Sequence, residues 1–209
     1  MPCDLRAGQQ IYWRRFGAGS RPAVLLHCSL AHSGAWAGLA GALGSDLQMT
    51  AFDLPGHGRS SDWDGVAEYQ HLSTQIAASF ITEPVDLIGH SFGATVALRL
   101  AVEQPQKLRS LTLIEPVFFA VAARDAPAAF TTVQPHIDAV KHALAQGDCL
   151  AAARDFGVMG ALGMTCLKDI KTVLQSAFIL LRRPRGRCIT MWRVCLRQGP
   201  WTILRRRHF

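Results

Sequence analysis

Residues 85–93 read Val-Asp-Leu-Ile-Gly-His-Ser-Phe-Gly, and the rest of the chain can be interpreted outward from them. The first four residues are typical of a buried strand, and residues 92–104 are apolar on most sides of a predicted helix. Gly-x-Ser-x-Gly between a strand and a helix predicts a sharp turn, because its small end residues let the two elements approach closely. A chance pentapeptide at an ordinary turn is the alternative. On the first interpretation, the Ser91 hydroxyl stands above the sheet, where N–H groups at the helix start would stabilise an oxyanion.

Short apolar runs alternate with helix-length segments on both sides of this turn. The expected strands are residues 11–16, 23–27, 49–54, 85–89 and 111–115. The expected helices are residues 32–43, 66–81 and 92–104. This alternation is typical of βαβ units, which form a parallel sheet covered by helices on both faces. After residue 118 the pattern becomes helical, with a breaker-rich stretch at 122–129 and short helices at 136–146 and 149–156.

Two further segments carry turn sequences directly after expected strands. The first is His27-Cys28-Ser29-Leu30, and the second is Asp-Leu-Pro-Gly-His-Gly-Arg-Ser at residues 53–60. The order H-x-S, then D-L-P-G-H-G-R-S, then G-H-S-F-G, each after its own strand, resembles the α/β-hydrolase fold superfamily. Within that superfamily the chain is most similar to the broad group of esterases, C–C hydrolases and related enzymes. The resemblance covers about residues 10–120.

The resemblance implies an α/β class of fold with three parts. Residues 1–116 would form an α/β-hydrolase core, with a mostly parallel sheet and helices on both faces. Residues 117–163 would form a partial helical cap, and the last strands of the family's sheet are missing from the pattern. Residues 164–209 would be a basic tail outside the family's pattern.

The resemblance also implies the roles of individual residues. Ser91 would be the nucleophile, the N–H of Phe92 one oxyanion donor, and a backbone N–H near Ser29 the second donor. The implied reaction is hydrolysis of a small-molecule ester or related acyl compound, with no metal and no organic cofactor. Cys28 stands where the family usually has Gly, and we expect an inert small residue there, since nothing in the local sequence lowers the pKa of the thiol. Asp53 is expected to tie its turn together by hydrogen bonds.

A serine nucleophile needs a general base, normally a histidine oriented by a carboxylate. Downstream of Ser91 the histidines are His136, His142 and His208. The first two lie on an expected cap helix, and the third is the penultimate residue with no strand before it. Glu115 ends the last expected strand, where some relatives place an acid. We therefore expect no catalytic histidine and impaired hydrolysis by the chain as written.

Composition divides the chain at about residue 164. The whole chain of 209 residues is 49% apolar and 18% charged, which favours one packed domain over disorder. Residues 164–209 nevertheless carry 11 Lys and Arg against a single acid, and residues 178–209 carry nine Arg and no acid. A coding sequence read out of frame gives such a composition, so we expect a frameshifted or truncated C-terminus. The alternative is a non-catalytic α/β-hydrolase-like scaffold whose basic arm binds nucleic acid or an anionic membrane surface.

Other classes of protein are not favoured by the sequence. No apolar run reaches the roughly 18 residues that span a bilayer, and the N-terminus lacks the layout of a secretory signal. The six cysteines have neither the spacing of zinc ligands nor that of a disulfide framework. We expect a reduced, cytoplasmic protein without a transmembrane segment, and nothing in the sequence indicates an oligomeric state.

Overall fold

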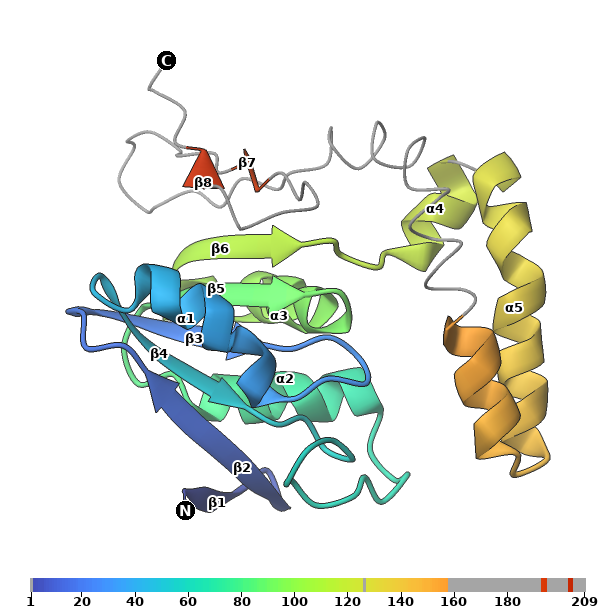
Figure 1. Cartoon of the computed structure of the whole chain (residues 1–209), viewed down its shortest axis with the longest axis horizontal. Coiled ribbons are helices and arrows are strands. Elements are labelled where there is room, and N and C mark those ends of the chain that lie inside the picture. The colour runs from blue at the N-terminus through green and yellow to red at the C-terminus, as the bar shows by residue number, and fades with distance from the viewer. Residues whose placement is uncertain (1, 126, 158–192, 195–202, 205–209) are drawn as a thin grey trace. The chain divides into compact units, whose positions relative to one another are not determined.

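A six-stranded sheet forms the centre of the fold, in the order β1-β2-β4-β3-β5-β6 (Figure 1). Its strands are β1 (Cys3–Arg6), β2 (Gln9–Phe16), β3 (Arg21–Leu26), β4 (Leu47–Phe52), β5 (Val85–His90) and β6 (Leu108–Ile114). β2 pairs antiparallel with both β1 and β4, whereas β4, β3, β5 and β6 are parallel neighbours. The predicted mostly parallel sheet is confirmed, and β1 is a strand that the sequence analysis missed.

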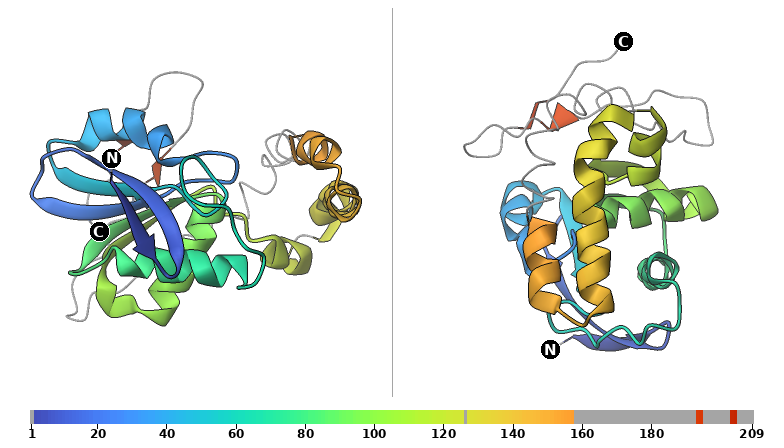
Figure 2. Two further views of the ribbon diagram at one scale, coloured as in Figure 1. Left: turned by 90° about the horizontal axis from the view of Figure 1, so that it is seen from below. Right: turned by 90° about the vertical axis from the view of Figure 1, so that its right-hand side faces the viewer.

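Helices cover both faces of this sheet (Figures 1 and 2). On one face, a 3-10 turn (Ser33–Trp36) and α1 (Ala37–Leu43) pack Trp36 and Ala40 against Leu25 and Met49. On the other face lie α2 (Tyr69–Ser79) and α3 (Phe92–Glu103). Their core side chains, together with strand residues of that face, include Ile76, Leu100, Leu26 and Leu87. Successive residues of β3 enter opposite cores because side chains alternate across a strand.

The structure, a computed structural model, describes residues 2–125, 127–157, 193–194 and 203–204. The chain divides into two compact units, one of residues 1–117 with 180–209 and one of residues 118–179. Most of the predicted basic tail at 164–209 lies outside the described residues. Its described parts are β7 (Arg193–Val194) and β8 (Ile203–Leu204), which pair antiparallel in a small sheet of their own. Within the described ranges, no helix is long and apolar enough to cross a membrane.

The second unit is helical where the structure describes it. It contains α4 (Phe119–Asp125), α5 (Pro127–Ala145) and a further helical segment at residues 149–157. The breaker-rich stretch at 122–129 contains the boundary between two helices, since α4 ends at Asp125 and α5 begins at Pro127. The helix expected at 136–146 is the second part of the longer α5. Pro127 is the first residue of α5, a position where a missing N–H removes no helical hydrogen bond.

His27 connects the ends of β3 and β4. Its side chain is buried, its Nε2 accepts a hydrogen bond from the Leu54 N–H at 2.9 Å, and its Nδ1 donates to the Cys28 carbonyl at 2.7 Å. This arrangement requires a neutral ring, and burial lowers the pKa of His27 from 6.5 to about 4. His27 therefore has a structural role in the turn, because both of its ring nitrogens form hydrogen bonds to the backbone.

Asp53 stabilises the neighbouring turn. One carboxylate oxygen accepts from the Ser33 N–H at 2.6 Å, and the other accepts from the Arg59 N–H at 2.9 Å. Gly58 lies so close to this carboxylate that an added Cβ would collide with it, which explains the glycine. Asp53 thus has the structural role that its place in the sequence suggested.

The low pKa of His27 predicts a pH-dependent contribution to stability. The unfolded state takes up a proton near pH 6.5 and the folded state only near pH 4, so the stabilisation is complete above about pH 6.5 and is lost as the pH falls. Replacement of His27 by Gln should therefore cost about 2 kcal/mol less at pH 5 than at pH 7.5. Urea unfolding of both proteins at both pH values measures this difference, and an equal cost at the two pH values would contradict a neutral, buried ring.

Candidate active site

Ser91 lies in a sharp turn between β5 and α3. Its backbone has φ +53° and ψ −114°, a conformation that non-glycine residues adopt at a cost of about 1–3 kcal/mol. The Ser91 N–H donates to the Ile114 carbonyl of β6 at 2.9 Å, and the Ser91 carbonyl accepts from the Ala94 N–H at 3.1 Å. These bonds hold the strained residue at the carboxyl edge of the parallel strands, where ligands bind in open α/β sheets.

Gly89 and Gly93 allow this turn to form. A Cβ at Gly93 would collide with the carbonyl oxygens of Leu26 and His27, so α3 lies directly against the end of β3. A Cβ at Gly89 would come within 2.6 Å of the Ala94 Cα and would also collide with the Gly93 carbonyl. Both glycines of the Gly-x-Ser-x-Gly sequence are therefore required by close packing of backbone against backbone.

The two predicted oxyanion donors lie at the same edge of the sheet. Phe92 is the first residue of α3, so its N–H has no carbonyl partner within the helix. Ser29 follows β3, which is the parallel neighbour of β5 in the sheet. Leu30, the residue after Ser29, adopts φ +61° and is largely exposed. The topology thus brings both backbone segments to the edge that carries Ser91.

A row of aromatic rings next to the turn was not anticipated from the sequence. Phe92 packs on Tyr69 with ring centres 5.3 Å apart, and Tyr69 meets Trp63 at 5.2 Å. The Tyr69 hydroxyl donates to the Pro55 carbonyl at 2.8 Å, and burial raises the pKa of Tyr69 to about 12. Tyr69 is therefore a neutral hydrogen-bond donor that connects α2 to the turn after β4.

Three ionisable side chains also meet at this edge. His90 lies 3.6 Å from Glu115 (Nε2 to Oε2), and the Cys28 side chain interacts electrostatically with both. The hydrogen bonds to Cys28 and then to Glu115 raise the pKa of His90 to about 9, and the hydrogen bond from His90 lowers the pKa of the Cys28 thiol. The expectation that nothing lowers the pKa of Cys28 was wrong. Cys28 follows β3, whereas His90 ends β5 and Glu115 follows β6. The sequence signal that could have found this group is that all three residues end or follow parallel strands.

The downstream histidines lie outside the described part of the unit that contains Ser91. His136 and His142 lie on α5, in the second compact unit, and His208 lies outside the described residues. That the chain lacks a catalytic histidine therefore stays a prediction. In the part of the chain that the structure describes, no three His, Cys, Asp or Glu side chains are grouped to hold a metal ion.

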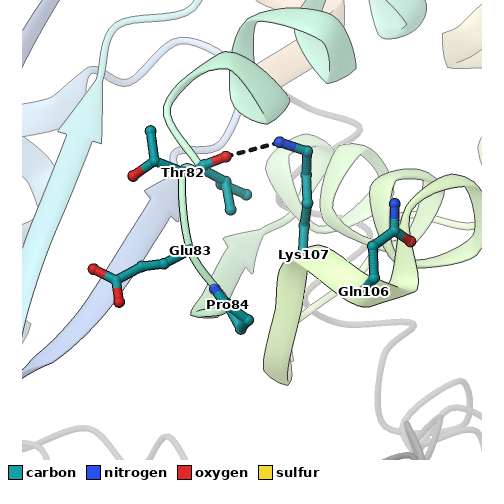
Figure 3. A pocket seen from close by; sticks show the side chains of 6 residues that line it. Thr82, Glu83, Pro84, Gln106 and Lys107 are labelled. Atoms are coloured by element: carbon teal, nitrogen blue, oxygen red, sulfur yellow. Dashed lines mark hydrogen bonds between the residues drawn. The ribbon is translucent and has the colours of Figure 1, made fainter.

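A pocket of about 210 Å³ lies at the opposite edge of the sheet (Figure 3). Pro84 precedes β5 and Lys107 precedes β6, so the pocket is at the amino ends of these strands. Lys107 Nζ donates to the carbonyls of Ile81 at 2.7 Å and Ala78 at 3.1 Å, near the end of α2. The lysine stabilises a helix terminus, and we do not place the active site here.

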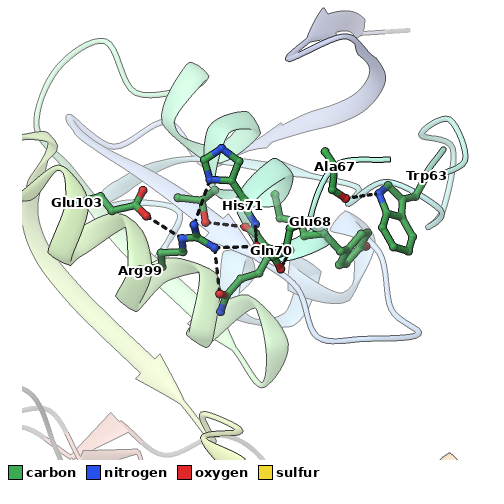
Figure 4. A network of polar contacts seen from close by, with 10 residues as sticks. Trp63, Ala67, Glu68, Gln70, His71, Arg99 and Glu103 are labelled. Atoms are coloured by element: carbon green, nitrogen blue, oxygen red, sulfur yellow. Dashed lines mark hydrogen bonds and ion pairs between the residues drawn. The ribbon is translucent and has the colours of Figure 1, made fainter. Parts of the chain in front are cut away.

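The polar network around Arg99 is structural too (Figure 4). Arg99 of α3 forms ion pairs with Glu103 at 2.7 Å and Glu68 at 2.8 Å. Glu68 also caps α2 by accepting hydrogen bonds from the N–H groups of Gln70 and His71. The network therefore connects the start of α2 to α3. The candidate active site remains the carboxyl edge of the sheet, where Ser91 lies.

Comparison with curated proteins points to esterases. A pimeloyl-[acyl-carrier protein] methyl ester esterase of Nitrosomonas europaea is 33% identical over 91 residues, which are 44% of this chain and 35% of that protein. The enzyme of the same name from Salmonella heidelberg is 31% identical over 112 residues, 53% of this chain and 43% of that protein. The chain thus spans less than half the length of these relatives.

Structural comparison agrees on the fold. A Bacillus megaterium epoxide hydrolase solved with an inhibitor superposes with a TM-score of 0.55 at 18% identity, covering 65% of this chain and 51% of that one. The model of the alpha/beta hydrolase family matches residues 23–201, a range that contains the strained serine, both packed glycines and the strands that position them. The chain belongs to the alpha/beta hydrolase family.

Proposed function

We propose that this chain is a serine hydrolase whose substrate is a small carboxylic ester or related acyl compound. The observation that carries the proposal is the strained backbone of Ser91 between β5 and α3. A nucleophile must be held out of the sheet toward substrate, and this turn does so at the edge where ligands bind. The curated relatives are named as methyl ester esterases, which favours an ester over other hydrolysable groups.

In the proposed mechanism, the Ser91 Oγ attacks the ester carbonyl carbon. The carbonyl electrons move onto oxygen, and the resulting oxyanion accepts hydrogen bonds from the Phe92 N–H and from an N–H near Ser29. The intermediate collapses, the alcohol leaves, and water then hydrolyses the acyl-serine. Each oxyanion donor contributes about 3–4 kcal/mol in enzymes where one has been removed.

The hydroxyl proton of Ser91 needs an acceptor when the oxygen attacks the ester. Whether the protein supplies that acceptor determines the rate of hydrolysis that we expect. Without a histidine base, the oxyanion donors and substrate binding alone give about 10³-fold acceleration over water. In such an enzyme, removal of the serine changes turnover little, because triad residues act as a unit. Covalent capture of the serine is therefore the informative readout.

We predict that a fluorophosphonate probe in large excess phosphonylates Ser91 slowly, over a long incubation, because we expect no histidine base to activate the hydroxyl. Intact-mass and peptide mass spectrometry should find one added phosphonyl group, on the peptide that contains Ser91. The Ser91→Ala variant should take up no probe there. Ser79→Ala is the matched control, because its hydroxyl only bonds the Ile76 carbonyl within α2, and it should be labelled like the unchanged chain. Equal labelling of Ser91→Ala would remove Ser91 as the nucleophile and favour the non-catalytic scaffold.

We also predict that Gly93→Ala disrupts the turn. The added Cβ would meet backbone oxygens of Leu26 and His27, which cannot move aside as a flexible side chain can. Overpacking of this kind costs about 1–3 kcal/mol, and it moves the Phe92 N–H away from Ser91, so labelling should slow as well. Gly41→Ala in α1 is the control, since no atom lies within 4 Å of its added Cβ and alanine favours a helix. Equal unfolding midpoints for the two variants would contradict the packing argument.

The catalytic acid and base that the proposed mechanism lacks would be expected within residues 164–209. The family match extends into this segment as far as residue 201, and most of the segment lies outside the described residues. The altered reading frame stays a prediction. Resequencing of the gene from codon 155 onward tests it, because another frame that encodes a strand-terminal Asp followed by Gly-His would supply the acid and base. If the present frame is confirmed, salt-dependent binding of RNA or DNA is the next measurement for the basic arm.

A further inference from the structure

Cys28, His90 and Glu115 lie at the carboxyl ends of three neighbouring parallel strands. β5 lies between β3 and β6, with Leu26 opposite Gly89 and His90 opposite Ile114. Cys28 follows β3 by two residues, His90 ends β5, and Glu115 directly follows β6. The sheet therefore places a thiol, an imidazole and a carboxylate in a row across one edge, with the imidazole in the middle.

The contacts along this row join the three groups. His90 Nε2 lies 3.6 Å from Glu115 Oε2, and the Cys28 side chain interacts electrostatically with the same imidazole. About a third of the His90 side chain and 41% of the Glu115 side chain are exposed, and Cys28 is a half-buried free cysteine. A reagent in solution can therefore reach the row, while its members still contact one another.

The backbone fixes the two outer members in place. The Cys28 carbonyl accepts hydrogen bonds from His27 Nδ1 at 2.7 Å and from the Ala31 N–H at 3.2 Å. Glu115 adopts φ +47°, directly after the Ile114 carbonyl that accepts from the Ser91 N–H. The proposed ester hydrolysis gives no role to any of these three side chains.

We propose that Cys28, placed by the sheet in one row with the His90 and Glu115 side chains, is a nucleophilic cysteine and a covalent modification site for soft carbon electrophiles. In the reaction with such an electrophile, the thiol proton resides on His90. The sulfur lone pair forms a sulfur–carbon bond while the bond to the leaving group breaks, and the leaving group departs with the electron pair. With iodoacetamide the products are a thioether at Cys28 and iodide.

The charges around Cys28 explain why the pKa of its thiol is lowered rather than raised. His90 from β5 lowers the pKa of the thiol by hydrogen bonding and by its positive charge. Burial and the negative charge of Glu115, which follows β6, act in the opposite direction with smaller effect. Glu115 nevertheless helps indirectly, because its hydrogen bond raises the pKa of His90 and keeps the imidazole charged beside the sulfur.

The test is the site-resolved rate of alkylation of the intact chain by iodoacetamide. Peptide mass spectrometry gives the rate at Cys28 and at Cys149, an exposed free thiol in the same molecule that serves as the reference. The ratio of the two rates should be at least about fivefold higher at pH 6.5 than at pH 9.5, because only the thiolate reacts. Cys28 and Cys149 differ in accessibility to the reagent. This difference cancels when the Cys28-to-Cys149 rate ratio at pH 6.5 is divided by the same ratio at pH 9.5.

Single substitutions test whether the row of Cys28, His90 and Glu115 causes the pH dependence of the alkylation ratio. His90→Gln should make the rate ratio the same at the two pH values within about twofold, because it removes the charge that stabilises the thiolate. His142→Gln, an exposed histidine on α5, is the matched control and should behave like the unchanged chain. Ser91→Ala should also retain the effect, so failure of the hydrolase proposal and failure of this one are distinguishable.

A second measurement covers the case in which His90→Gln does not fold. The difference in thiolate absorbance near 240 nm between the unchanged chain and Cys28→Ser, followed across the pH range, should titrate below the ordinary thiol pKa of about 8.5. An unchanged rate ratio between pH 6.5 and 9.5, or a difference absorbance that titrates at or above that value, would overturn the proposal.

Discussion

The close approach of α3 to the ends of β3 and β5 is the contact on which the candidate site depends. Gly93 brings the first turn of α3 against the carbonyls of Leu26 and His27, and Gly89 leaves room for the same turn on β5. With the helix start so near the strands, the residue between them has too little chain for a relaxed connection. Ser91 consequently adopts a positive φ and lies at the helix N-terminus.

That contact is supported by bonds that join strand ends which are distant in the sequence. His27 uses both ring nitrogens to hold the ends of β3 and β4 together, and Asp53 holds the turn that follows β4. On the other side, the Ser91 N–H reaches the last carbonyl of β6. The carboxyl edge of the sheet is therefore rigid over four strands, and rigidity of this kind positions catalytic groups.

The same edge carries the two side chains that we propose as nucleophiles, Ser91 and Cys28. Ser91 is held by strain in its own backbone, whereas Cys28 depends on an imidazole and a carboxylate from the two strands beyond its own. The Cys28 thiol lies beside the segment that we propose as an oxyanion donor. A change in the charge of the His90 and Glu115 pair would thus act close to the proposed ester site.

The sequence by itself determined the features that depend on neighbouring residues. Apolar runs and breakers indicated eight elements of the sheet and its helices. The glycine spacing in residues 85–93 indicated the serine turn itself, because steric fit within nine residues is local. Local patterns placed the start of a helix at residue 136, whereas α5 begins at Pro127, because proline is tolerated in the first turn of a helix. Only the tertiary structure decided that β3 and β6 both lie beside β5, since strand order depends on how each crossover returns to the sheet. The meeting of Cys28, His90 and Glu115, with the pKa changes that result, follows from that order, because electrostatic coupling requires contact in space whatever the separation in sequence.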